Sequence, residues 1–448
     1  MRRHASPLDR PADWLGAGEA LERILATLQP LPPERVALAE ALGRVLAESV
    51  VSPVDQPPWT NSAMDGYACR AEDVAGAAPD QPRVLRVIEE VPAGAFPTRP
   101  IAAGEAVRLM TGAPVPEGAD TVVRLEHTRP GTGDQVVVLR DWDAGRNLRE
   151  RGEDLRAGEA VLPPGRLLRP AEIGVLASVG RAQVAVTRRA RVAILSNGDE
   201  LVDLDAFEEV RAGRRIVSSN SYALAAAVRA AGGEPWVLGI ARDTRESLRE
   251  HIARAAGADL LVTTAGASVG DHDLMKEVLE ELGYRVDFWR VKVQPGSPFS
   301  FGRLGDAAPA ASGSPPVTGE AGAPLPVFGL PGNPVSALVT FELFVHPALR
   351  KLHGRLELYP PTLRVRTADR IPSRSGLLRF LRATLAADGA GGWLARLTGP
   401  QGSGILTSVA RADALLIVPL ELEVVEAGTE LLAIPLGGAD AAAASPPF

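Results

Sequence analysis

The sequence is poor in cysteine and aromatic residues, and it lacks positive net charge. Its single cysteine among 448 residues, Cys69, excludes an internal disulfide and a thiolate metal cluster, and it fits a reducing compartment. Aromatic residues make up only 4% of the chain, too few for a surface that stacks bases. The formal net charge of -7 provides no basic field for a phosphate backbone, so we expect no nucleic-acid partner.

The sequence also lacks long apolar runs. The first residues, MRRHASPLDRPADW, contain no apolar signal core, and no later run is long enough to span a bilayer. We therefore expect a cytoplasmic protein without a membrane partner. The 46% of hydrophobic and 23% of charged residues are typical of a globular chain. Its length suits roughly two to four domains.

Lysine is scarce as well. Of the 48 basic residues, only Lys276, Lys292 and Lys351 are lysines. A GC-rich coding bias explains most of this imbalance. A lysine in a chain where almost every other basic residue is arginine is nevertheless a candidate for a role that needs its point charge. Lys292 is the lysine that lies in a polar, strand-like stretch.

The middle of the chain alternates strands and helices. Short apolar runs end at residues 197, 240 and 266, and each is followed by a helical pattern. Asn220 stands where a helix N-cap belongs, and Pro334 stands at the first position of another helix. This alternation predicts an α/β unit with a parallel sheet.

The flanking regions show short strand-like runs between Gly and Pro residues, which indicates small β modules. The fold class we predict is α/β plus mostly-β modules: a parallel-sheet domain, small β domains and a C-terminal β-barrel. The expected division is 14–32 plus 189–355 for the α/β domain, 33–52 plus 153–188 for a linker domain, 53–152 for a small β domain and 356–437 for the barrel.

Polar loops follow successive strands of the expected sheet. Ligands of open parallel sheets bind at the carboxyl ends of the strands, where glycines and helix N-termini accommodate anions. Carboxylates on neighbouring strand ends would repel one another unless a divalent cation joined them, which favours Mg²⁺. These loops indicate a phosphate-bearing substrate held by amides and Mg²⁺. Each loop taken alone could equally be an ordinary polar turn, and Asp243 taken alone could be a helix N-cap.

Three further stretches carry polar groups. Residues 57–68 (PPWTNSAMDGYA) form either a site loop with one carboxylate or a domain-crossing linker, and residues 110–116 alone read as a turn. Arg290 and Lys292, two residues apart in a strand-like run, would share one face, as an anion site or as a solvated face. The histidines show no metal-ligand spacing, and no nucleophilic triad is evident.

In this order the motifs resemble the MoeA/gephyrin E-domain family of molybdopterin molybdenumtransferases. The resemblance covers essentially residues 16–437. It rests on PPWTNSAMDGYA (57–68), RLMTGAPVPEGADTVV (108–123), VAILSNGDEL (192–201), SSNSYAL (218–224), DLLVTTAGASVGDHD (259–273), VFGLPGNPVSALVTF (327–341) and LTGPQGSGILTSVARADALLIVP (397–419).

The resemblance implies an elongated subunit in a homodimer, with the pterin on the α/β domain and the NSAMDGYA loop supplied by the partner subunit. The implied reaction inserts molybdate, a substrate, into adenylylated molybdopterin with Mg²⁺-dependent release of AMP. A molybdopterin adenylyltransferase is a candidate partner. The carried-over catalytic positions are Asp65, Thr111, Glu200, Asp243 and Asp273, of which Glu200, Asp243 and Asp273 would surround the metal. The substrate-binding positions are Ser196, Gly198, Asn220, Gly266, Ser268, Gly270, Arg290, Lys292, Pro331, Gly332, Asn333, Pro334, Ser336 and Ser403.

The chain departs from the family pattern at three places. Gln294 and Ser297 stand where the family usually has lysines, STGDEL reads SNGDEL, and the glycine pair of the TTGG loop is Ala265-Gly266. The anion site would then rest on Arg290 and Lys292, and the choice between molybdate and tungstate stays open. A non-catalytic molybdopterin carrier or scaffold is the alternative function. An adenylyltransferase is disfavoured because those enzymes share only the α/β part.

Overall fold

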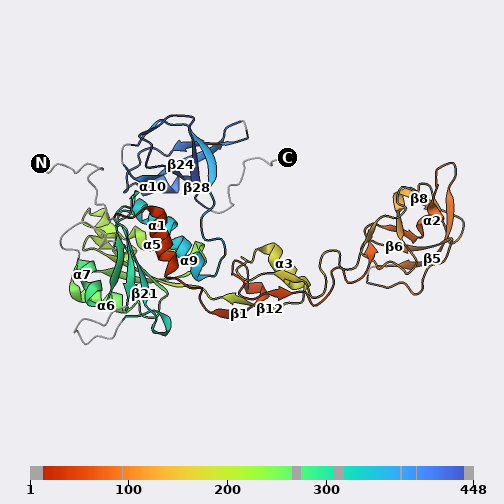
Figure 1. Ribbon diagram of the computed structural model, residues 1–448, viewed down its shortest axis with the longest axis horizontal. Coiled ribbons are helices and arrows are strands. Elements are labelled where there is room, and N and C mark those ends of the chain that lie inside the picture. Colours follow the sequence, from red (N-terminus) through yellow and green to blue (C-terminus); the bar gives the residue numbers. More distant parts are fainter. Residues whose placement is uncertain are drawn as a thin grey trace.

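The computed structural model describes residues 14–92, 94–264, 274–305, 317–373, 376–389 and 391–437. The molecule is elongated (Figure 1): an α/β domain and a C-terminal β domain lie together at one end, and a small β domain lies at the other. A narrow region with β1 (Pro33–Ala37), β12 (Gln183–Thr187) and α3 (Pro170–Ser178) connects the two ends. Within the described ranges, no helix has the length and apolar character needed to cross a membrane.

The α/β domain is built on a six-stranded sheet, in which the inner strand β13 (Arg191–Asn197) is buried from Val192 onward. Because side chains alternate along a strand, Val192 and Ile194 face one side and Ala193 and Leu195 the other. The helices on the first side are α1 (Ala17–Ala26), α5 (Ser219–Ala230), α8 (Pro334–Thr340) and α9 (His346–Leu352); those on the second are α6 (Arg245–Ala253) and α7 (Leu274–Glu281).

The predicted parallel sheet is present over four strands and is then extended by two antiparallel ones. The strand order is β16 (Glu234–Ala241), β13, β17 (Leu260–Thr264), β21 (Leu325–Leu330), β20 (Ser300–Leu304) and β18 (Arg285–Trp289). The first four are parallel, whereas β20 runs antiparallel to both of its neighbours. The four parallel carboxyl ends therefore lie at one edge of the sheet, where the sequence places its polar loops.

The expectation that one strand, ending at Pro295-Gly296, carries Arg290 and Lys292 on the same face is wrong. β18 ends at Trp289, and Arg290 adopts a φ of 74°, a left-handed conformation that interrupts the alternation of side chains. The chain then enters β19 (Val293–Gln294), which pairs with β24 (Leu378–Ala387) of the C-terminal domain. Arg290 and Lys292 consequently do not lie on one face of a single strand.

Both flanking β domains are present. The small one, at the far end, has the strand order β7 (Thr121–Arg124), β4 (Gly66–Cys69), β6 (Glu105–Leu109), β5 (Arg83–Val91), β9 (Gln135–Val138) and β8 (Thr128–Pro130). The C-terminal one contains β22 (Leu363–Thr367), β24, β25 (Trp393–Leu397), β26 (Ala414–Val418) and β28 (Glu430–Pro435). Its β24 pairs with both β25 and β26, and this closes the predicted barrel.

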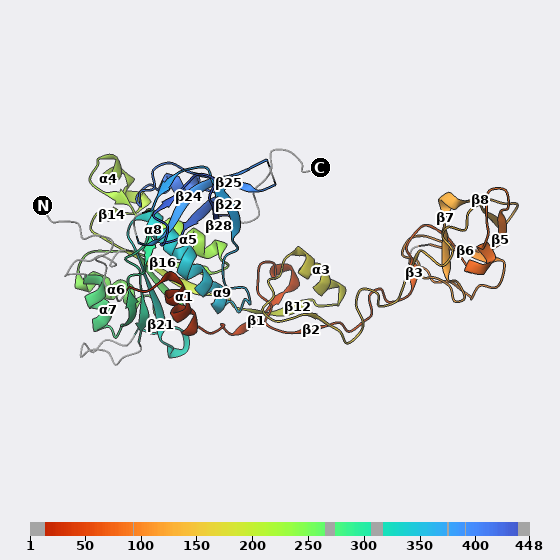
Figure 2. The ribbon, with the colours of Figure 1, turned by 45° about the horizontal axis from the view of Figure 1, so that its top comes forward.

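The C-terminal barrel packs directly on the α/β domain. Phe380, Leu415 and Ile434 of the barrel belong to the same buried cluster as α1 and α9. Figure 2 shows the barrel beside β14 (Leu201–Val202) and α4 (Phe207–Arg211), which project from the α/β domain. The shared core holds these two domains together at the end of the molecule that carries the strand-end loops.

The connecting region contains a buried carboxylate that makes its stability sensitive to acid. Glu172 is 4% exposed and accepts hydrogen bonds from the guanidinium groups of Arg166 and Arg169. These bonds, first that of Arg169, lower the pKa of Glu172 from its usual value of 4.5 to about 2. Because the folded-state pKa is depressed, its contribution is complete above about pH 4.5 and is lost as the pH falls toward 2.

We expect Glu172→Gln to lower the free energy of unfolding by about 1 to 3 kcal/mol at neutral pH, since two arginines lose their ionised acceptor. The difference from the wild type should shrink as the pH falls from 5 to 2, roughly the interval over which the carboxylate is protonated. Calorimetric unfolding of both proteins across this range checks the prediction. A difference that stays constant with pH would contradict it.

Candidate functional site

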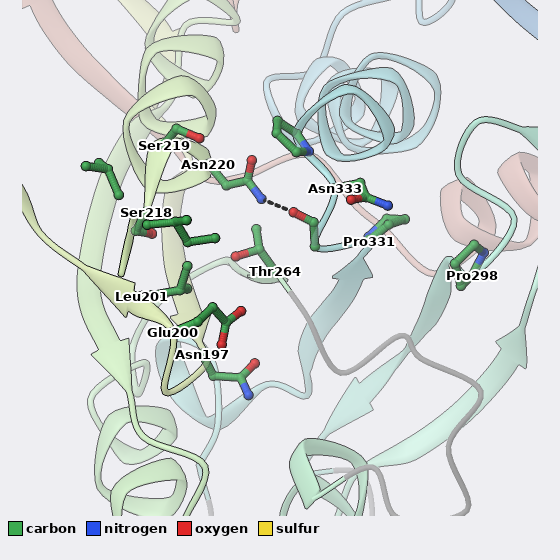
Figure 3. Close-up of a pocket in the computed structure, with 14 residues that line it drawn as sticks. Asn197, Glu200, Leu201, Ser218, Ser219, Asn220, Thr264, Pro298, Pro331 and Asn333 are labelled. Carbon is green, nitrogen blue, oxygen red and sulfur yellow. Dashed lines mark hydrogen bonds between the residues drawn. The ribbon is translucent and has the colours of Figure 1, made fainter. Parts of the chain in front are cut away.

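A pocket of about 470 Å³ opens at the carboxyl ends of the parallel strands, where the sequence predicts a site. Figure 3 shows it between the loop after β13, the start of α5 and the loop after β21. The residues that line it are Asn197, Glu200, Leu201, Ile216, Val217, Ser218, Ser219, Asn220, Thr264, Pro298, Pro331, Gly332, Asn333 and Pro334. Six of the predicted site residues are thus brought together on its walls: Glu200, Asn220, Pro331, Gly332, Asn333 and Pro334.

Buried hydroxyl groups support one side of the pocket. The Ser196 Oγ lies 2.9 Å from both the Ser221 Oγ and the Thr264 Oγ1, and Ser218 lies 2.7 Å from Ser221. Ser196 is fully buried. It therefore tethers β13, β17 and α5 beneath the pocket, and Ser218 and Thr264 are the members of the network that reach the pocket wall.

Asn220 joins two walls of the pocket and does not cap its helix. α5 begins at Ser219, with Ser218 in the N-cap position, so the predicted N-cap assignment for Asn220 is wrong. Instead its Nδ2 donates a 2.8 Å hydrogen bond to the carbonyl oxygen of Gly332, as Figure 3 shows. This bond fixes the start of α5 against the LPGNPVS loop.

The LPGNPVS loop leads from β21 into α8. Pro334 stands in the first turn of the helix, as the sequence predicts, and Asn333 occupies the N-cap position before it. The amide of Val335 donates a 3.1 Å hydrogen bond to the carbonyl oxygen of Ser403 in the C-terminal domain, and Ser336 is 4% exposed. The hydrogen bond from Val335 to Ser403 thus joins the loop to the C-terminal domain, and neither Ser336 nor Ser403 is among the residues that line the pocket.

The loop after β13 presents the Glu200 carboxylate. Gly198 has a φ of 145°, and a Cβ atom built on it would lie 2.5 Å from the Glu200 Oε2. The Glu200 side chain is therefore folded back over Gly198, and only a glycine leaves room for it. In the described part of the chain, this carboxylate has no hydrogen-bond or ion-pair partner, so it is available to a ligand.

We expect Gly198→Ala to fold but to lose activity about tenfold or more, since the new methyl group must displace Glu200 and about 1 Å of displacement is costly at a reacting site. Ala substituted at Gly213, a glycine with nothing within 4 Å of its Cβ position and a positive φ, is a matched control for backbone strain. Steady-state kinetics and thermal unfolding of both variants check the prediction. Equal losses in the two variants would show that strain alone is responsible.

Asp243 holds the same loop in place. It was expected as a metal ligand or as a helix N-cap, but the N-cap of α6 is Thr244, whose hydroxyl accepts the Ser247 amide at 3.3 Å. The two carboxylate oxygens of Asp243 accept hydrogen bonds from the Asn197 Nδ2 at 2.9 Å and from the Asp199 amide at 3.3 Å. Asp243 is not among the pocket-lining residues.

The two basic residues expected to hold an oxyanion lie elsewhere. The Arg290 guanidinium lies over the Trp14 ring, 5.1 Å from its centroid. Lys292 lines a separate groove with Trp14, Glu19 and Asp287. Neither side chain reaches the pocket between β13 and α8. The left-handed turn at Arg290, which the residue pattern does not reveal, accounts for this placement.

Asp65 and Thr111 form a pair in the small β domain. The Asp65 Oδ1 accepts hydrogen bonds from the Thr111 amide at 2.7 Å and from its hydroxyl at 2.8 Å. These two bonds hold the pKa of the Asp65 carboxyl below its usual value. Asp65 immediately precedes β4, which lies at the opposite end of the molecule from the pocket (Figure 1). One chain therefore cannot bring Asp65 and Glu200 together in this arrangement.

Four predicted positions, Gly266, Ser268, Gly270 and Asp273, lie outside the described residues. Among the residues that the structure does describe, no group of three or more His, Cys, Asp or Glu side chains could hold a metal ion. Conversely, Asn197, Ser218, Ser219 and Thr264 line the pocket but were not among the predicted residues. All four belong to sequence motifs that were recognised, so their position at strand ends could have identified them.

Comparison with known proteins accounts for all of these domains. Residues 15–180 match the "MoeA N-terminal region (domain I and II)", residues 193–351 the "Probable molybdopterin binding domain" and residues 364–436 the "MoeA C-terminal region (domain IV)". A molybdopterin molybdenumtransferase of Nostoc sp. is 39% identical over 90% of this chain and 88% of its own length. The chain belongs to the MoeA family. A second member, "Molybdopterin molybdenumtransferase 2" of Mycobacterium tuberculosis, is 38% identical over 92% of this chain and 97% of its own.

The fold is shared with a solved MoeA structure as well. The molybdopterin biosynthesis MoeA protein of Pyrococcus horikoshii superimposes with a TM-score of 0.78 at 31% identity, over 94% of this chain and all of that one. The resemblance inferred from the sequence motifs is thereby confirmed for the family and for the fold class.

Proposed function

We propose that this MoeA-family chain inserts molybdate into adenylylated molybdopterin and releases AMP in a Mg²⁺-dependent reaction. Family membership makes it a molybdopterin molybdenumtransferase of molybdenum cofactor biosynthesis. The observation that carries the proposal is the pocket at the carboxyl ends of the parallel strands, with its serine and asparagine walls and the Glu200 carboxylate, which has no partner among the described residues. Such a site suits a substrate that combines a polar ring with a phosphate group.

The substrate would be held between the two walls that Asn220 joins. The groups proposed for the pterin and phosphate are Gly198, Asn220, Pro331, Gly332, Asn333 and Pro334 near the pocket, with Gly266, Ser268 and Gly270 from the following strand end. Ser196, Ser336 and Ser403 would contribute without lining the pocket, because the hydrogen bonds around them hold its walls in place.

The acidic groups proposed for the Mg²⁺ site are Glu200 and Asp273 as ligands and Asp243 as a residue that supports the site without contacting the metal. Glu200 fits the role of a ligand because its carboxylate lines the pocket and has no partner within the described ranges. Bound Mg²⁺ would supply positive charge at the pyrophosphate oxygens of the adenylylated substrate. Glu200 would position that charge, and Asp243 would keep the loop after β13 in shape through its two hydrogen bonds.

Asp65 and Thr111 would complete the site from a second copy of the chain. The proposed homodimer follows from their placement at the far end of the molecule, which leaves the pocket without them in a single subunit. Arg290 and Lys292 lie outside the pocket walls. We propose that they favour the oxyanion through their field at a distance and not by direct contact.

Rescue of a molybdoenzyme in a strain that lacks its own molybdenumtransferase tests the proposal. We expect the chain to restore the enzyme at ordinary molybdate concentrations and not to replace a missing adenylyltransferase. A carrier or scaffold would bind molybdopterin without restoring the enzyme. That result would refute the transferase proposal and support the alternative. The candidate partnership with a molybdopterin adenylyltransferase can be tested in parallel by co-purification of the two proteins.

A further inference from the structure

The amide oxygen of Asn197 is buried at the pocket wall and has no hydrogen-bond partner among the described residues. Asn197 is the last residue of β13 and is only 8% exposed. A buried carbonyl oxygen without a partner is destabilising by about 1 to 3 kcal/mol. Such a group in an otherwise well-bonded loop indicates a ligand.

Asp243 fixes the direction of this oxygen. A carboxylate only accepts hydrogen bonds, so the NH₂ group of Asn197 must be the half of the amide that faces Asp243, at 2.9 Å. The Oδ1 is then forced to the opposite side. Figure 3 shows it directed toward the side of the pocket where the Glu200 carboxylate lies.

In the described part of the chain, no donor bonds to either of the two oxygen groups. Arg242 and Arg215, the nearby cations, donate to backbone carbonyl oxygens of the same loop, including that of Asp199. Glu200 is held over Gly198 and has no partner in the described ranges. Two hard oxygen acceptors without a donor between them favour a cation over a neutral hydrogen-bonding group.

We propose that Asn197 is a ligand of the divalent cation beside Glu200 and that Asp243 acts as a positioning residue through Asn197. This inference deepens the proposed function and rests on it. Mg²⁺ usually keeps several waters and binds through one or two protein oxygens together with substrate phosphates. The Asn197 Oδ1 and the Glu200 carboxylate therefore suffice as the protein's share among the described residues.

Titration of the full-length protein with Mn²⁺ alone, followed by electron paramagnetic resonance, tests the assignment. We expect Asn197→Ala to weaken Mn²⁺ binding about tenfold or more, and Asp243→Ala to weaken it by a similar factor. In the double variant Asn197→Ala/Asp243→Ala, the loss should exceed that of either single variant by no more than about twofold, because Asp243 acts through Asn197. Asn147→Ala, at an asparagine of the small β domain whose Nδ2 donates to the Val122 carbonyl oxygen, is the control and should bind Mn²⁺ as the wild type does.

Three outcomes would overturn the assignment: absence of Mn²⁺ binding by the wild type, undiminished binding by Asn197→Ala, or losses that multiply in the double variant as for two independent ligands. Asn197→Leu, similar in shape and without the oxygen, should reproduce the loss if the alanine variant fails to fold. AMP release is measured separately. A protein that binds Mn²⁺ through Asn197 but releases no AMP would refute the proposed function and leave the metal assignment standing.

Discussion

Asp65→Ala should fold as the wild type does and lose molybdenum transfer by about a hundredfold or more. Asp65 is exposed, and its side-chain contacts are the two hydrogen bonds from Thr111, so its removal opens no cavity. The melting temperature should stay within about 4 °C of the wild type. Activity should fall because the variant removes a carboxylate that is ionised at neutral pH, as aspartates ordinarily are, and that would close the site on a cationic or hydrogen-bond-donating partner.

Steady-state transfer rates and calorimetric unfolding of the same preparations check this expectation. Asp80→Ala provides the control, because Asp80 is another exposed acid of the same domain and has no role in the proposed site. Full activity of Asp65→Ala would remove Asp65 and its domain from the reaction. A large fall in melting temperature would instead assign Asp65 a structural role.

The second large effect concerns the division of the site between two subunits. Glu200→Ala should also lose about a hundredfold or more of the transfer rate, since the free carboxylate at the pocket is removed. When Asp65→Ala and Glu200→Ala chains are co-expressed, half of the randomly assembled dimers are mixed. Each mixed dimer has one site with an intact Asp65 from one chain and an intact Glu200 from the other, so about a quarter of the wild-type rate should return.

This recovery can be measured on purified mixed protein, with separately expressed and then blended variants as the control. Blended homodimers that do not exchange subunits should remain inactive. If the co-expressed mixture is no more active than the single variants, both residues act within one subunit, and the proposed sharing of the site is wrong.

Much of the fold could be predicted because its signals are local. The run Arg191–Asn197 is apolar and contains the β-branched residues Val192 and Ile194, and it forms a buried inner strand of the sheet. Pro334 begins a helix because its fixed φ suits the first turn. The pocket also lies at the predicted edge of the sheet, since parallel strands bring their carboxyl ends together whatever the loop sequences are.

The remaining details depend on partners distant in the sequence. Nothing near Arg290 predicts its left-handed backbone, which separates it and Lys292 from the pocket. Asn220 and Asp243 both stand where helix caps are expected, yet each bonds to a loop from another strand, at Gly332 and at Asn197 respectively. Local propensity gives a capping role to such residues, and tertiary contacts reassign them.

The most direct test of the account is AMP release from adenylylated molybdopterin by the purified protein, measured with Mg²⁺ present and with molybdate either present or withheld. We predict release that requires both Mg²⁺ and molybdate and that falls about a hundredfold or more in Asp65→Ala and Glu200→Ala. Tungstate in place of molybdate shows which oxyanion the site prefers. Absence of AMP release with all components present, from a folded protein that binds molybdopterin, would contradict the account.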